Sequence, residues 1–411
     1  MDFTTFLSQL NDALIAENGA NLAYLLRPTS PHGKNFVKEF RNPPPTQESL
    51  ERNYKGSIQS PWDEIAIKYV LVCYNVARRR PQDAYREHSA LVQAFSRRYF
   101  TENRGWTLPA LFSLLRDLRD LAFDADFYAK YNGQKSECME DAARKIADAF
   151  TNCVTDRISP PDQSRKWGVY YVVGLVLKSY FRLRRISLSK NILRALEVHR
   201  DIPALSQFPR SHQVTFRYYL GMIHFLNEDH AKAEEELTLA FYHCHVEAHS
   251  NQERILAYLL PLRLLKGHLP SDELMQRFPT LSEIFMPFVD AIRLGDVTAF
   301  DQALEQRGSK LVDLNLMLTM ERAREVCLRG LFRRVWVASD KNNRIPIPMF
   351  HCALRISGID VDQEEAECLV ANQIYKGFMR GYISHEKQMV VLANINAFPR
   401  LADRPNPLNM L

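Results

Sequence analysis

Residues 218–245 read YYLGMIHFLNEDHAKAEEELTLAFYHCH and hold two apolar helical runs joined by a short polar turn. Asn227, Glu228 and Asp229 supply turn and N-cap chemistry. The small and apolar positions of the two runs are Leu220, Gly221, Ile223 and Phe225, then Ala231, Ala233, Leu237 and Ala240. Because Gly and Ala let two backbones approach closely, the stretch predicts a helix pair of the tetratricopeptide type.

The same pattern recurs elsewhere in the chain. A helix ends, a few polar residues turn the chain, and a second helix begins in ARRRPQDAYREHSALVQAF (77–95), RLRRISLSKNILRALEV (182–198) and IRLGDVTAFDQALEQ (292–306). The spacing between these units is irregular. Residues 61–310 are therefore expected to form a degenerate array of TPR-like helical repeats.

The C-terminal part changes character after about residue 310. IPIPMFHCALRI (345–356) begins a helix behind two prolines. DVDQEEAECLVANQIYKGFMRGYIS (360–384) is expected to hold a long amphipathic helix, capped by Asp360 or Asp362 and with Lys376 and Arg380 near its end. GYIS and MVVLA flank the polar tip HEKQ, which is typical of a hairpin. Helices followed by a hairpin predict a winged helix over residues 311–400, so the expected fold is an all-α helical-repeat solenoid ending in this domain.

The two ends of the chain are predicted separately. FTTFLSQLNDALI (3–15) is expected to be one helix. Pro43, Pro44 and Pro45 cannot lie inside a helix, so about residues 28–60 are expected to form an irregular connection that closes the region 1–60. Residues 401–411 are expected to be a tail.

Composition narrows the function. The net charge of +5 permits a nucleic-acid partner without implying one, and neither G-x-G-x-x-G nor G-x-x-x-x-G-K-[ST] occurs in the sequence. Seven scattered cysteines without a C-x-x-C pair favour reduced thiols in the cytosol or nucleus. No secretory signal or run of about 20 apolar residues occurs, so a soluble intracellular protein is expected.

Five stretches carry a resemblance to a known family: SRKWGVYYVVGLVLKSYFRL, the stretch around residues 215–245, RILAYLLPLRLLKGHLP, LRGLFRRVW and ECLVANQIYKGFMRGYISHEKQMVVL. Over about residues 62–399 the chain resembles PCI-domain proteins, which are scaffold subunits of the proteasome lid, the signalosome and an initiation-factor complex. The likeness is to the signalosome-subunit-twelve-like branch, which includes the PCI subunit of the nuclear-pore-associated mRNA-export complex.

The resemblance implies a non-enzymatic scaffold without a cofactor. Such a subunit pairs through its winged helix with a second, larger PCI protein and binds a small acidic, largely disordered protein along its repeats. The assembly then offers a basic surface to RNA or DNA in the nucleus, in splicing and transcription elongation or in mRNA export. An alternative is a signalosome- or proteasome-lid-associated scaffold that does not bind nucleic acid.

The segment YHCHVEAH (242–249) raises a rival class, a metalloprotein. On a helix His243 and His245 face opposite sides, whereas His245 and His249 are four residues apart and would share a face. A structural zinc site needs about four well-spaced ligands, which this segment does not supply, so a plain repeat helix is favoured. No local nucleophile motif such as G-x-S-x-G occurs, and no catalytic residue is assigned.

Clusters of cations are the candidate nucleic-acid sites, since phosphate contacts require long cationic side chains. The candidates are Lys178, Arg182, Arg184, Arg185, Lys190 and Arg194 in the repeats, Arg333 and Arg334 in FRRVW, and Lys376, Arg380 and Lys387 in the winged helix. A solvated basic face is the alternative for each group. Met379, Tyr382 and Val390 are expected to form an exposed apolar patch for the PCI partner.

Overall fold

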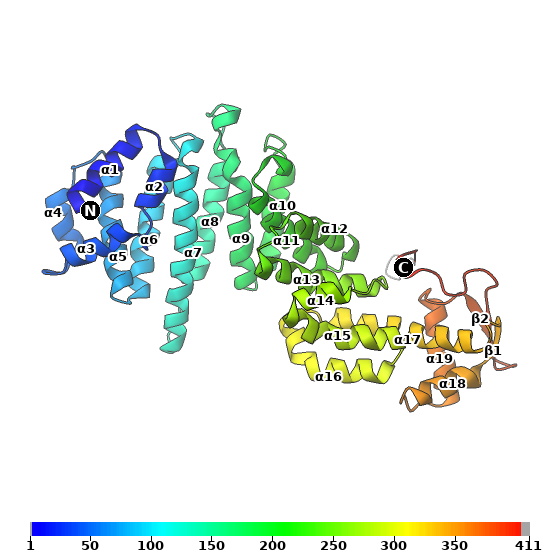
Figure 1. Ribbon diagram of the computed structural model, residues 1–411. Helices are drawn as coiled ribbons and strands as arrows, with labels where there is room; N and C mark the ends of the chain where they lie inside the picture. The colour runs from blue at the N-terminus through cyan, green and yellow to red at the C-terminus, as the bar shows by residue number, and fades with distance from the viewer. Residues whose placement is uncertain (1, 404–411) are drawn as a thin grey trace. The chain divides into compact units, whose positions relative to one another are not determined.

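The computed structural model describes residues 2–403 and consists mainly of helices, with one small sheet near the C-terminus (Figure 1). Two compact units divide the chain, Met1–Tyr219 and Leu220–Leu411, and helix α11 (Arg210–Leu226) runs through the boundary. The fold is a helical-repeat solenoid followed by a winged helix, as the sequence predicts. Of the predicted tail, residues 404–411 lie outside the described part of the chain.

Helices that follow one another in sequence pack side by side in the first unit, so that α5 contacts α6, α6 contacts α7, α7 contacts α8 and α8 contacts α9. The helices of this unit are α1 (Phe3–Ile15), α2 (Gly19–Leu25), α3 (Pro31–Glu39), α4 (Gln47–Tyr54), α5 (Trp62–Ala77), α6 (Pro81–Phe95), α7 (Leu108–Tyr131), α8 (Cys138–Val154), α9 (Val169–Arg182) and α10 (Ser189–Val198). Packing of each helix on its neighbour is what a repeat array requires.

The N-terminal region corrects one prediction. Residues 28–60 contain α3 and α4, so the expected irregular connection is wrong over these helices. The Ser30 side chain caps α3 with Pro31 at its first turn, and Thr46 and Ser49 form a capping box at the start of α4. Proline is favoured in a first helical turn, where its missing N–H costs nothing. Pro43, Pro44 and Pro45 lie between the two helices, outside both.

The predicted helix pair at the start of the second unit is confirmed. The Asp229 side chain accepts a hydrogen bond from Lys232 N and caps α12 (His230–His243). A Cβ atom built on Gly221 would lie only 2.7 Å from Leu237 Cγ, so glycine is required at this close approach. Ala233, Leu237 and Ala240 are fully buried. These three residues therefore form the face of α12 that packs against α11, as predicted, whereas Ala231, which was expected on the same face, is exposed.

The second unit continues with α13 (His249–Leu265), α14 (Asp272–Arg277), α15 (Pro279–Leu294), α16 (Val297–Asp313) and α17 (Met317–Ala338). Gly295 ends α15 in the left-handed conformation, with φ at 65°. A Cβ atom there would lie 2.7 Å from Leu331 N of α17. Glycine is therefore needed twice over, for the turn and for the close packing of α15 on α17.

The winged helix consists of α18 (Ile347–Ile356), α19 (Gln363–Tyr375) and a three-stranded antiparallel sheet. The strands are β1 (Arg344–Pro346), β2 (Gly381–Ser384) and β3 (Met389–Leu392), in the order β1-β3-β2. The predicted hairpin is β2 and β3, and Asp362 is the residue that caps α19, in a capping box with Glu365. The expected continuation of this helix to Arg380 is wrong, because α19 ends at Tyr375 and Gly377 has a positive φ of 73°. Strand β1 was not predicted, because it is three residues long and ends in proline.

Candidate nucleic-acid and partner interfaces

The residues 178–200, called here the basic segment, cover the end of α9, the short helical turn η5 (Ile186–Leu188) and α10. They hold seven Lys or Arg residues and one Glu. Lys178 and Arg182 lie four residues apart on one face of α9, as do Lys190 and Arg194 on α10. These four residues, with Arg184 and Arg185 in the turn, are exposed. The sequence-predicted cations of this unit therefore share one surface region.

Two of these arginines are fixed by contacts with neighbouring helices. The Arg182 guanidinium carbon lies 4.5 Å from the centroid of the Phe123 ring on α7. Arg185 Nη2 donates to Glu140 Oε1 of α8 over 2.7 Å. Such contacts hold long side chains in place. The ion pair with Glu140 also offsets part of the positive charge of Arg185. Within the described part of the chain, Arg184, Lys190 and Arg194 form no ion pair.

The turn that carries Arg184 has a defined backbone. Arg184 has a positive φ of 56°, and Arg185 N donates to Tyr180 O over 2.9 Å. Tyr180 itself is buried, so the turn is anchored to the core of the unit. The basic segment therefore presents its cations from a fixed turn between two helices.

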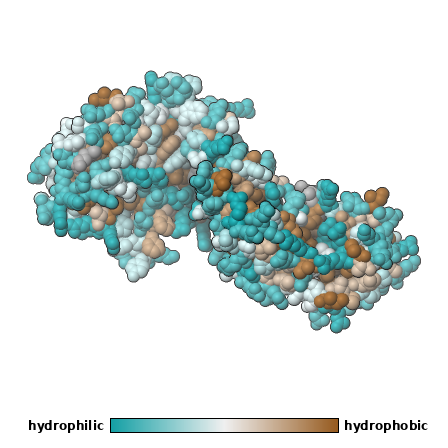
Figure 2. Space-filling model, in the orientation of Figure 1, coloured by the Kyte–Doolittle hydropathy of each residue, from teal (hydrophilic) through white to brown (hydrophobic). Residues whose placement is uncertain are grey.

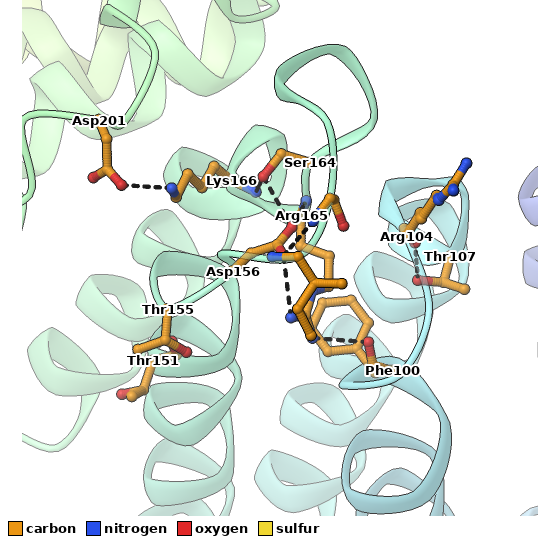
Figure 3. Close-up of polar contacts among 12 residues, drawn as sticks. Phe100, Arg104, Thr107, Thr151, Thr155, Asp156, Ser164, Arg165, Lys166 and Asp201 are labelled. Carbon is orange, nitrogen blue, oxygen red and sulfur yellow. Dashed lines mark hydrogen bonds and ion pairs between the residues drawn. The ribbon is translucent and has the colours of Figure 1, made fainter.

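A buried ion pair anchors the chain ahead of α9 (Figure 3). Asp156, which follows α8, accepts hydrogen bonds from Arg165 N at 2.8 Å and Ser164 Oγ at 2.9 Å. Arg165 Nη1 donates to Phe100 O at 3.0 Å. Burial alone would raise the pKa of the Asp156 carboxyl, but the hydrogen bonds from Arg165 and Ser164 outweigh it and lower the pKa. This charged pair joins the loops before α7 and α9.

The arginines of α17 serve the second unit's own packing in part. Arg333 and Arg334 are exposed, as expected. Arg334 Nη2 donates to Arg293 O in the last turn of α15 over 3.2 Å. A cation at a helix C-terminus satisfies carbonyl groups that have no partner within the helix. Arg334 therefore has a structural role, and both Arg333 and Arg334 line a groove on this unit.

The cations of the winged helix lie among acids. Lys376 Nζ lies 2.6 Å from Glu325 Oε1 of α17, and the wing-tip residue His385 pairs with Glu367 of α19 over 2.9 Å. Arg380 and Lys387 are exposed. The first turn of α19 carries Glu364 and Glu365. In winged helices that bind DNA, the N-terminal residues of this helix contact the groove. Carboxylates at this position would repel the phosphates of a nucleic acid.

The predicted partner patch needs correction. Met379 is 1% exposed and Val390 is fully buried, so both belong to the domain's own core. The expectation that they are exposed is wrong, because Val390 lies opposite Ile345 and Ile383 on the inner face of the sheet. Tyr382 is 63% exposed, as predicted.

The opposite side of the sheet, called here the outer sheet face, exposes Tyr382 and Pro346, while Val391 and Met389 are half-buried. It is not wholly apolar, because the exposed Arg344 lies opposite Val391 and Ser384 lies opposite Met389. Tyr382 lies opposite Val391, and Pro346 lies opposite Met389. Directly opposed residues share a face of the sheet, and strand residues alternate between faces. The alternation of residues in GYIS and MVVL divides them into two faces. The sequence alone does not tell which of these faces is the inner one.

The histidine-rich segment provides no metal site within residues 2–403, where no group of three or more His, Cys, Asp or Glu side chains is placed to hold an ion. His243 ends α12, and His249 begins α13. All seven cysteines are free. None of the described helices has the length and apolarity needed to cross a membrane.

Comparisons with known proteins agree with this geometry. Residues 304–394 match the PCI domain family, and this range covers α17 and the winged helix. The chain is 35% identical over 419 residues to "Protein CSN12 homolog" of Schizosaccharomyces pombe, covering 97% of this chain and 98% of that protein. It is 30% identical over 402 residues to "PCI domain-containing protein 2" of Xenopus laevis, covering 97% of each.

A Drosophila melanogaster protein, "PCI domain-containing protein 2 homolog", is also 30% identical, over 403 residues. These similarities extend over nearly the whole chain and so include the repeats as well as the winged helix. Together with the fold, they show that the chain belongs to the PCI-domain family and is homologous to the CSN12 homologs and PCI domain-containing protein 2.

Proposed function

We propose that this PCI-domain protein is a scaffold subunit that binds RNA or DNA through the basic segment and pairs with a second PCI protein through its winged helix. The observation that carries the proposal is the concentration of exposed cations at residues 178–200, held on a fixed turn. Phosphate backbones are bound by such clusters, largely without regard to sequence. The proposal extends to a small acidic protein bound along the repeats.

The winged helix is assigned to protein pairing and not to nucleic acid. The first turn of α19 is acidic, Lys376 is paired with Glu325, and the outer sheet face exposes the apolar side chains of Tyr382 and Pro346. Apolar surface that is exposed on one chain is commonly covered in an assembly. Arg380 and Lys387 would then act as polar contacts at the edge of the protein interface.

We further propose that the assembly works in the nucleus, in transcription-coupled mRNA processing or export. This part rests on the family resemblance, together with the expected nucleic-acid binding. A scaffold that binds only proteins is the alternative outcome, and the affinity for nucleic acid separates the two.

The test is a fluorescence anisotropy titration of a labelled 20-nucleotide RNA of mixed sequence with the full chain. Reversal of Arg182, Arg184 and Arg185 to Glu should weaken binding at least tenfold, since three phosphate contacts become three repulsions. The control reverses Arg78, Arg79 and Arg80, which lie in the turn between α5 and α6.

This control is closely matched. All three of its arginines are exposed, Arg79 has a positive φ of 56°, and Arg78 lies over the Tyr74 ring at 5.4 Å. Both variants therefore change the net charge equally, in the same unit and in the same kind of turn. Equal effects of the two reversals, or no effect of either, would refute the assignment to the basic segment.

A further inference from the structure

The end of α7 carries exposed aromatic side chains beside the basic segment. Phe123, Phe127 and Tyr131, called here the aromatic stripe, are spaced four residues apart and so follow one face of the helix. They are 36%, 65% and 84% exposed, so the exposure grows toward the end of the helix. In Figure 1 this end of α7 extends beyond the neighbouring helices of its unit. Figure 2 shows a visible surface on which hydrophilic residues predominate and apolar groups are scattered among them.

The stripe is ordered by stacking. The rings of Phe123 and Phe127 are stacked, with centroids 6.4 Å apart and planes inclined by 21°. Arg182 lies over Phe123 at 4.5 Å. The Arg182 guanidinium group therefore stacks on Phe123, and Phe123 stacks in turn on the exposed Phe127. Planar groups arranged in this way offer a surface for a further planar group.

A groove of about 560 Å³ runs along these side chains. Its lining residues are Phe123, Asp126, Phe127, Lys130, Tyr131, Met139, Arg182 and Leu183. Lys130 and Tyr131 are the last two residues of α7 in this lining. Arg182 belongs both to the groove and to the basic segment. The groove therefore continues from the surface that is proposed to bind phosphates.

The charges that face a ligand in this groove are mainly positive. The Asp126 carboxylate accepts hydrogen bonds from Ser136 Oγ, Cys138 N and Met139 N at 2.6–3.0 Å, so it is occupied as a cap of α8. Asp124 directly follows Phe123 and thus lies about 100° away around the helix. Lys130 and Arg182 remain as exposed charged groups of the lining.

We propose that the aromatic stripe binds unpaired bases of a single-stranded nucleic acid, which stack on Phe127 and Tyr131 while Lys130 and Arg182 contact the phosphates. The proposal rests on the proposed nucleic-acid function and names its ligand as single-stranded. Aromatic rings beside a cationic track are the usual means of binding single strands without sequence preference. In a duplex the bases are already stacked and paired, so they do not reach these rings.

The experiment compares a labelled 20-nucleotide single-stranded RNA with a duplex of the same length, using the full chain. Replacement of both Phe127 and Tyr131 by Ala should lower the affinity for the single strand by about fivefold or more for each ring. Binding of the duplex should stay within about twofold, and the dependence on salt should not change. A variant with Trp at both positions should restore single-strand binding.

Tyr242→Ala is the matched control, because Tyr242 is 75% exposed on α12 of the other unit. Circular dichroism and thermal melting check the fold of each variant. Equal losses for single strand and duplex would overturn the proposal, as would unchanged single-strand affinity. If the Arg182, Arg184 and Arg185 reversal still weakens binding in that case, only the stripe fails, and the basic segment stands. If the Phe127→Ala/Tyr131→Ala variant keeps its affinity for RNA but no longer binds a protein that the wild type binds, the groove has a protein ligand. That outcome would also overturn the proposal.

Discussion

His88 is a fully buried histidine between α6 and α7 whose neutral form stabilises the first unit. Its Nε2 donates to Leu114 O over 3.0 Å, and its Nδ1 is buried without a hydrogen-bond partner among the described residues. Burial lowers the pKa of His88 to about 4, because a proton on Nδ1 would be a buried donor without an acceptor. The folded protein therefore holds this side chain neutral at pH values where the unfolded chain protonates it.

The resulting prediction concerns acidification. Since the folded pKa lies below the unfolded value of about 6.5, the stabilisation is complete above pH 6.5 and is lost as the pH falls toward 4. Between pH 7 and pH 5, wild type should lose roughly 2 kcal/mol more unfolding free energy than His88→Gln. Urea unfolding at both pH values measures this difference.

His268→Gln is the control for this measurement, because His268 is exposed. The other buried histidines, such as His32, are present in both proteins and cancel in the comparison. An identical pH dependence in wild type and His88→Gln would contradict the assignment.

The sequence predicted the exposure of the charged residues of the basic segment correctly, but it did not predict the burial of Met379 and Val390. All the cations of the basic segment are outside, because burying an unpaired charge is too costly for any fold to allow. Met379 and Val390 were misassigned because an apolar residue in a short strand suits either face, and only the pairing of β3 with both β1 and β2 decides which face is inner. The aromatic stripe on α7 was missed, although its spacing of four residues was visible.

Among the elements, the winged helix was predicted in outline and helix α1 was predicted with its observed bounds, whereas α3 and α4 were missed. The hairpin, the cap at Asp362 and the two helices follow from local signals of turn and capping chemistry. Strand β1 forms only because β3 pairs with it, so no local signal marks it. In residues 28–60 the prolines indicated breaks correctly, but the short helices α3 and α4 on either side of them depend on packing against α5.

The outer sheet face leads to a prediction about pairing. Asp at both Tyr382 and Met389 places two charges on this face without touching the core side chains Val390 and Ile345. Val391 is left unchanged, because it lies directly opposite Arg344, which would pair with a carboxylate there. Affinity purification of the tagged full chain from its native cells should recover a second PCI-domain protein, identified by mass spectrometry. The double variant should lose most of that partner, because burying unpaired carboxylates at an interface is unfavourable.

Val246→Asp is the control for pairing, since Val246 is also highly exposed in the same unit but lies in the loop after α12. Circular dichroism of the purified proteins checks that the double variant folds. Recovery of the PCI partner in wild-type amounts with Tyr382→Asp/Met389→Asp would rule out this face.

Over the whole molecule, charge is distributed unevenly. Residues 178–200 carry a formal charge of +6, while the complete chain carries +5, so the rest of the chain is close to neutral. A local cluster of cations and a uniformly distributed positive charge predict different effects of charge reversal on the salt dependence of the binding constant. For single strands the logarithm of the binding constant falls by about 0.7 per phosphate contact for each tenfold rise in salt.

Reversal of Arg182, Arg184 and Arg185 should therefore reduce the magnitude of the salt slope by roughly 2, measured by anisotropy between 50 and about 300 mM salt. Reversal of Arg78, Arg79 and Arg80 should leave the slope unchanged, although it alters the net charge by the same amount. Equal reductions in both variants would show that long-range charge, and not local contacts, governs the affinity.

The strand order β1-β3-β2 has a consequence for self-association. Both outer strands have one side that the sheet itself does not pair. Strand β1 is protected by its three-residue length and by Pro346, which has no N–H to donate. Strand β2 contains no proline, so its open edge is a template on which another copy of the chain can add a strand. Edge-to-edge aggregation through this sheet is therefore expected to begin at β2 and not at β1.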